Sequence, residues 1–71
     1  MSQNERVFDY LVKHPNGITQ FEAIHELGIL RLSARISDLR KNGAVIDSER
    51  VTVKNRFDEN CYVSRYKLVR G

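Results

Sequence analysis

Two different spacings of apolar residues divide the chain at Gly43. Before it, apolar residues recur three or four positions apart, as do Leu32, Ile36 and Leu39, which places them on one side of a helix. After it, apolar and polar residues alternate, most clearly over residues 50–54, which is typical of a half-buried strand. The pattern therefore predicts helices up to Gly43 and β-structure beyond it.

Two capping boxes predict where the first two helices begin. In a capping box a Ser or Thr hydroxyl accepts a hydrogen bond from the N–H three residues on, and the Glu at that position reaches back. The two pairs are Ser2 with Glu5 and Thr19 with Glu22. Residues 14–17, His-Pro-Asn-Gly, end the first helix, and Gly28 favours the left-handed conformation that ends the second. In the second helix Ala23, Ile24 and Leu27 are expected to face inward.

The third helix is expected over residues 30–42, with Gly43 as its end. Away from its apolar stripe it carries Arg31, Ala34, Arg35, Ser37, Asp38 and Lys41. A capped helix, a turn containing glycine and a second, basic helix form the helix-turn-helix pattern, in which the second helix enters a DNA groove. From these residues alone, an equally good alternative to DNA binding is that the basic face of this helix is simply exposed to solvent.

Two strands are expected after the helices. Residues 44–46 begin the first, which continues through 50–54, and residues 61–68 form its partner. The intervening residues are rich in Asn and Asp, which favour turns, so this segment is the tip of a hairpin. Ile18, before the second helix, either packs as a hydrophobic staple or forms a short strand beside the hairpin.

Composition predicts a small globular protein of one domain, residues 1–71, with 41% hydrophobic and 30% charged residues. No apolar run approaches the about 18 residues of a membrane span, and MSQNERVFDY lacks the features of a signal peptide, so we expect a cytoplasmic location and no membrane partner. Cys61, His14 and His25 are not spaced as metal ligands. We therefore expect no catalytic residues, metal, cofactor or small-molecule ligand.

Charge is distributed unevenly along the chain. The formal net charge is −2 across residues 1–29 and +5 across residues 30–71, which add to the +3 of the whole chain. The basic part begins at the predicted third helix. Such an asymmetry is expected of a protein that binds a polyanion.

The chain resembles the small winged helix-turn-helix domains of bacterial and phage DNA-binding proteins. The resemblance rests on T-x-x-E-A-I-x-x-L-G and on SARISDLRKNGAV, and it continues through VTVKNRF and CYVSRYKL, so it covers nearly the whole sequence. It implies an α+β, mainly α fold, in which a three-helix helix-turn-helix is followed by a β-hairpin wing. The sequence fits this family only if the turn at Gly28 is two residues longer than usual. Ile36 and Leu39 then fall at the core positions of the recognition helix.

The resemblance also implies sequence-specific binding of double-stranded DNA, by a small transcription regulator or an excisionase-like recombination accessory factor. The recognition helix 30–42 would enter the major groove and the wing, residues 54–60, would touch the backbone or minor groove. The implied contacts are Arg31, Ser33, Arg35, Asp38 and Lys41 on the recognition helix, Thr19 and Gln20 at the second helix, and Lys54, Asn55 and Arg56 on the wing.

Alternatives to these contacts remain open. Arg35 and Asp38 have the spacing of an ion pair, and Lys54 and Arg56 could serve only to protect an exposed hairpin from aggregation. The same surface could bind a protein without direct DNA readout, and a protein partner or weak self-association on DNA is compatible with the pattern. An enzyme is not expected, because the sequence contains no phosphate-binding glycine loop and no arrangement of catalytic residues.

Overall fold

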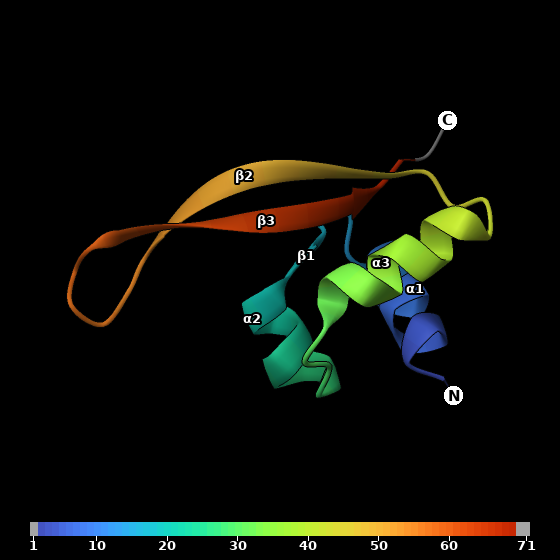
Figure 1. The fold of residues 1–71 in the computed structure, drawn as a ribbon, viewed down its shortest axis with the longest axis horizontal. Coiled ribbons are helices and arrows are strands. Elements are labelled where there is room, and N and C mark those ends of the chain that lie inside the picture. Colours follow the sequence, from blue (N-terminus) through green and yellow to red (C-terminus); the bar gives the residue numbers. More distant parts are fainter. Residues whose placement is uncertain (1, 70–71) are drawn as a thin grey trace.

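The structure, a computed structural model, describes residues 2–69. The elements follow in the order α1 (Gln3–Lys13), β1 (Ile18–Thr19), α2 (Gln20–Glu22), the π-helix η1 (Ala23–Leu27), α3 (Leu32–Lys41), β2 (Ile46–Lys54) and β3 (Asn60–Leu68). The predicted fold class is confirmed: α1, the continuous α2–η1 and α3 precede a hairpin. Figure 1 shows this hairpin projecting well beyond the helices, with its turn at the far end.

The sheet contains three antiparallel strands in the order β1-β3-β2. β2 and β3 pair along their whole length, from Ile46 opposite Leu68 to Lys54 opposite Asn60. Ile18 of β1 lies opposite Tyr66 of β3. Of the two roles that the sequence left open for Ile18, the structure therefore shows the short strand, and β1 ties the start of the second helix to the sheet.

The core lies between the helices and the part of the sheet nearest to them. Leu32, Ile36 and Leu39 are buried in it, as the helical spacing predicts, and α3 packs there against α1. The complete set of buried apolar residues is Val7, Leu11, Ile18, Ala23, Ile29, Leu32, Ile36, Leu39 and Ile46. Their burial supplies the main driving force for folding in a domain this small.

The second helix departs from the expected pattern of burial. Ala23 is buried and Leu27 is half-buried, as predicted, but Ile24 is 41% exposed, so the prediction that it faces inward is wrong. The cause is the π-helical turn: hydrogen bonds that span five residues rotate the following side chains away from their α-helical positions. After Gly28, which takes the predicted left-handed conformation, Ile29 fills the core instead and is fully buried.

The starts of α3 and β2 also differ from the prediction. α3 begins at Leu32, two residues later than expected, and Leu30 before it is 77% exposed. β2 begins at Ile46, so residues 44 and 45 are not part of the strand. The amide of Ala44 donates to the carbonyl oxygen of Leu39 at 3.0 Å, so the backbone there still closes the end of the helix.

Candidate nucleic-acid interface

α3 presents a polar face to solvent. Because Leu32, Ile36 and Leu39 face the core, the opposite side of the helix exposes Ser33, Ser37 and Lys41. Ser33 and Lys41 are predicted contact residues, and the structure exposes both side chains. Ser37 was not among the predicted contacts, although its place on the helical wheel indicated the same face. The three side chains give this side of the helix a polar, exposed surface.

The beginning of α3 is closed by a side chain from another element. Arg31, at the cap position, makes no side-chain hydrogen bond to the helix. Instead Gln20 accepts from the amide of Leu32 through Oε1 at 3.0 Å and donates through Nε2 to the carbonyl oxygen of Ile29 at 3.0 Å. Gln20 thus fixes the turn between the two helices. Both polar atoms of this side chain thus take part in hydrogen bonds inside the fold, and its contact with a phosphate stays a prediction.

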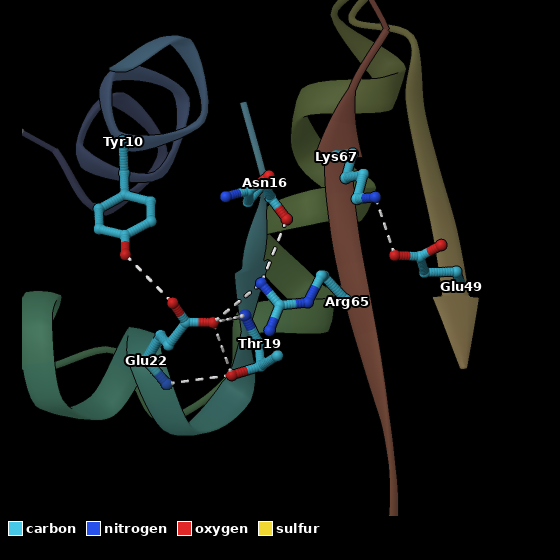
Figure 2. Close-up of polar contacts among 7 residues, drawn as sticks. All are labelled: Tyr10, Asn16, Thr19, Glu22, Glu49, Arg65 and Lys67. Carbon is cyan, nitrogen blue, oxygen red and sulfur yellow. Dashed lines mark hydrogen bonds and ion pairs between the residues drawn. The ribbon is translucent and has the colours of Figure 1, made fainter. Parts of the chain in front are cut away.

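Thr19 belongs to a polar network that joins the second helix to the rest of the fold (Figure 2). Glu22 Oε1 accepts from the Thr19 amide at 3.2 Å and from Thr19 Oγ1 at 3.1 Å, which confirms the predicted capping box. Glu22 Oε2 accepts from the Tyr10 hydroxyl at 3.3 Å, and Arg65 Nη1 lies 3.5 Å from Oε1. Arg65 Nη1 also donates to the Asn16 carbonyl oxygen at 3.2 Å.

This network has two consequences for the interface. It fixes the helix-turn-helix relative to α1 and β3, because Tyr10 and Arg65 both contact Glu22. It also buries Thr19, which is only 4% exposed. The Thr19 side chain therefore does not reach the surface, and its burial is incompatible with the predicted contact between this side chain and a phosphate. Burial, followed by the nearby negative charge of Glu22, raises the pKa of Tyr10 above its ordinary value.

Arg35 and Asp38 form the ion pair that the sequence offered as an alternative. Arg35 Nη2 lies 3.3 Å from Asp38 Oδ2, and Arg35 Nη1 donates to Gln3 Oε1 of α1 at 3.3 Å. Arg35 is half-buried and is therefore less accessible than a DNA contact on this helix requires. The reason is its position on the flank of α3 that faces α1, where its guanidinium links the two helices.

At the tip of the wing, two of the three predicted contact residues serve the turn itself. Asn55 Oδ1 accepts from the amides of Phe57 at 2.9 Å and Glu59 at 3.1 Å, and Lys54 Nζ lies 3.3 Å from Asp58 Oδ1. Asn55 therefore stabilises the turn as an Asx motif does. Arg56 is exposed and has no ion-pair partner within residues 2–69.

Ion pairing separates the cations of the chain into two groups. Lys13, Arg35, Lys54, Arg65 and Lys67 each lie within 4.0 Å of a carboxylate. Within residues 2–69, no carboxylate lies within 4.0 Å of the side-chain nitrogens of Arg6, Arg31, Arg40, Lys41, Arg50 and Arg56. Of these, Arg40 donates to the carbonyl oxygen of Ile46 and supports the connection from α3 to β2. The uncompensated charge therefore lies mainly on α3 and the wing, and it includes Arg50, which the prediction missed.

The described residues limit the other kinds of site. No group of three or more His, Cys, Asp or Glu residues within 2–69 could hold a metal ion. Nor does any helix in that range have the length and apolar character needed to cross a membrane.

A helix-turn-helix with a buried stripe on its second helix, followed by a hairpin that projects from the sheet, defines a winged helix-turn-helix domain as the class of fold. The sequence profile of the winged helix-turn-helix domain matches residues 2–71, and the chain belongs to this family. A search of the curated proteins and a search of the solved structures each found no match.

Proposed function

We propose that this domain binds double-stranded DNA in a sequence-specific manner, as a small transcription regulator or an excisionase-like recombination accessory factor. In this proposal α3 lies in the major groove, and the wing contacts the adjacent backbone or minor groove. One observation carries it: the cations that no carboxylate neutralises within residues 2–69 lie mainly on α3 and the wing. The family membership of the chain supports the same conclusion.

The exposed residues of α3 divide into two roles in this proposal. Arg31, at the start of the helix, has a guanidinium fork that suits the two acceptors of a guanine edge, and Ser33 and Ser37 can donate to or accept from base edges. Lys41, at the other end, suits a phosphate. These are the α3 side chains that are exposed and unpaired within the described range.

Arg35 and Asp38 act indirectly in this proposal. Their ion pair and the hydrogen bond from Arg35 to Gln3 hold α3 against α1. Arg56, on the wing, contacts the DNA backbone, and Lys54 and Asn55 stabilise the turn that contains Arg56.

A second function, binding of a protein partner, is supported by an apolar hollow between the second helix and the wing. It has a volume of about 460 Å³, and Phe21, Val53, Phe57 and Cys61 supply its apolar lining. Phe21 and Phe57 are 54% and 73% exposed. Exposed aromatic residues around a hollow are typical of surfaces that bind other proteins.

The first test is selection of a preferred site from random duplexes by mobility shift, followed by fluorescence anisotropy on selected and scrambled DNA. We expect Arg31→Ala to cost about 1–3 kcal/mol on the selected duplex and much less on the scrambled one, because a base contact is lost. Arg6→Ala is the matched control, since it removes an exposed arginine from α1 that also has no ion-pair partner within residues 2–69.

Two outcomes would contradict the proposal. Equal losses for Arg31→Ala and Arg6→Ala on both duplexes would remove α3 from the recognition surface. Absence of any duplex binding below about 100 mM salt would favour the protein-binding function, because phosphate attraction alone is visible under those conditions.

A further inference from the structure

One face of the two paired strands combines positive charge with an absence of carboxylates from either strand. Side chains alternate between the two faces of a strand, so the register of β2 and β3 determines which residues share a face. We call one set the polar ribbon face: Ser48, Arg50, Thr52, Lys54, Asn60, Tyr62 and Ser64. All seven residues are exposed.

The opposite face of the same ribbon has a different character. It carries both carboxylates of β2, those of Asp47 and Glu49, and beyond them the half-buried Val51 and Val53. The acidic residues of β2 are thus separated from Arg50 by the sheet itself. A polyanion that approaches the polar ribbon face meets positive charge without a carboxylate from either strand beside it.

The partner of Arg50 is an aromatic ring rather than a carboxylate. Its guanidinium carbon lies 5.8 Å from the centroid of the Tyr62 ring. The two residues are diagonal neighbours across the strands, since Arg50 lies opposite Ser64 and Thr52 lies opposite Tyr62. A cation–π contact restrains the guanidinium but leaves its charge and its donors available, unlike a carboxylate partner. Tyr62 is 68% exposed, so its hydroxyl is available as well.

The tip of the hairpin has less positive charge available to a phosphate than the polar ribbon face. Residues 54–59 contain two cations and two carboxylates, and one of those cations, Lys54, is already paired with Asp58. Even with Lys54, which also ends the polar ribbon face, the tip therefore carries no net charge, while Arg50 lies on the regular, paired part of the sheet.

We propose that the wing binds the DNA backbone mainly through the polar ribbon face, with Arg50 on a phosphate and the Tyr62 hydroxyl as a second donor, rather than through its tip. Arginine and tyrosine are common phosphate-contacting residues. The face continues the side of the sheet on which Ile46, Tyr66 and Leu68 pack against the helices, and it extends beyond the helical part of the molecule (Figure 1). This inference rests on the proposed DNA binding and states where the wing makes its contact.

The test is the salt dependence of duplex binding by Arg50→Gln and by Lys67→Gln. Both variants remove one positive charge from β2 or β3, but Lys67 lies on the opposite face and is paired with Glu49 at 2.9 Å. Anisotropy is measured on a random-sequence 20-bp duplex, a length of about two helical turns, with salt raised fourfold from about 50 to about 200 mM. If Arg50 neutralises one phosphate, the slope of log affinity against log salt shrinks by roughly 0.9 in Arg50→Gln.

Over that fourfold range, the wild type then loses about 3.5-fold more affinity than Arg50→Gln, because fourfold raised to the power 0.9 is about 3.5. Lys67→Gln is expected to keep the wild-type slope. Arg50→Lys, which retains the charge, is expected to restore it, and Tyr62→Phe to weaken binding at every salt concentration without changing the slope. Thermal melts of each variant check that the fold is intact.

Equal slopes for Arg50→Gln and Lys67→Gln, in a wild type that binds duplex, would overturn this inference and leave the proposed function standing. A larger reduction of the salt slope in Arg56→Gln than in Arg50→Gln would place the phosphate contact at the tip of the hairpin and would also overturn this inference. A wild type that binds no duplex at about 50 mM salt would refute both, since non-specific phosphate contacts are strongest there.

Discussion

Removal of the Glu22 side chain should destabilise the whole domain although the residue is partly exposed. Its carboxylate accepts from Thr19 and Tyr10 and pairs with Arg65, so one side chain connects β1, α1 and β3 to the second helix (Figure 2). Glu22→Ala breaks all of these contacts and leaves the Thr19 amide without its capping partner. Glu22→Gln keeps the shape of the side chain and one acceptor oxygen but loses its charge.

The expected size of the effect follows from these contacts. Loss of one half of a capping box costs about 1 kcal/mol. The remaining contacts are 3.3 to 3.5 Å long and the Glu22 side chain is 36% exposed, so each is worth about 0.5 kcal/mol rather than the larger value of a buried charged bond. Glu22→Ala should therefore cost about 2 kcal/mol, and Glu22→Gln about half of that. For a domain of this size, 2 kcal/mol corresponds to a fall in Tm of about 10 °C.

Thermal unfolding monitored by circular dichroism measures this effect. Glu26→Ala is the control, because it removes an equally charged and more exposed side chain from the following turn of the same helix. It should change the free energy of unfolding by less than about 0.5 kcal/mol. If the two alanine variants melt at the same temperature, Glu22 does not connect these elements as described.

Two further predictions concern a turn and a titrating group. In urea titrations, Gly17→Ala should lower the free energy of unfolding by more than about 2 kcal/mol and Gly28→Ala by about 1 kcal/mol. Both glycines have positive φ, but only at Gly17 would an added Cβ overlap a backbone carbonyl of β3. Equal losses in the two variants would contradict this reasoning. The pKa of Tyr10 is raised in the folded state, so the folded protein holds the proton of the Tyr10 hydroxyl more tightly than the unfolded chain, whose tyrosine titrates near 10.0. The resulting contribution to the free energy of unfolding is complete below that pH and is lost as the pH rises through the higher folded pKa. Tyr10→Phe should therefore lose less stability than the wild type between pH 9.5 and 11.5, a range set by the ordinary tyrosine pKa of about 10, and identical losses in the two proteins would refute this account.

Features that depend on near neighbours along the chain were predictable from the order of the residues. The capping box at Thr19 and Glu22 joins residues three apart, and the buried stripe of Leu32, Ile36 and Leu39 follows from helical spacing alone. The alternation after residue 43 likewise predicted a paired hairpin. Such features were predictable because their partners lie within one helical turn or directly across the hairpin, whatever the rest of the fold does.

Which side chains remain available to a ligand depends on how the elements pack against one another. Gln20 is occupied because the fold brings it to Leu32, 12 residues away, and Arg35 is half-buried because Gln3 of α1 lies beside it. Ile24 points outward because the second helix closes with a π-helical turn, a choice coupled to the burial of Ile29. The contacts of Gln20 and Arg35 join segments far apart in the chain, and Ile29 is buried in a core built from several elements. The free energy of such contacts outweighs the local preference that the sequence expresses.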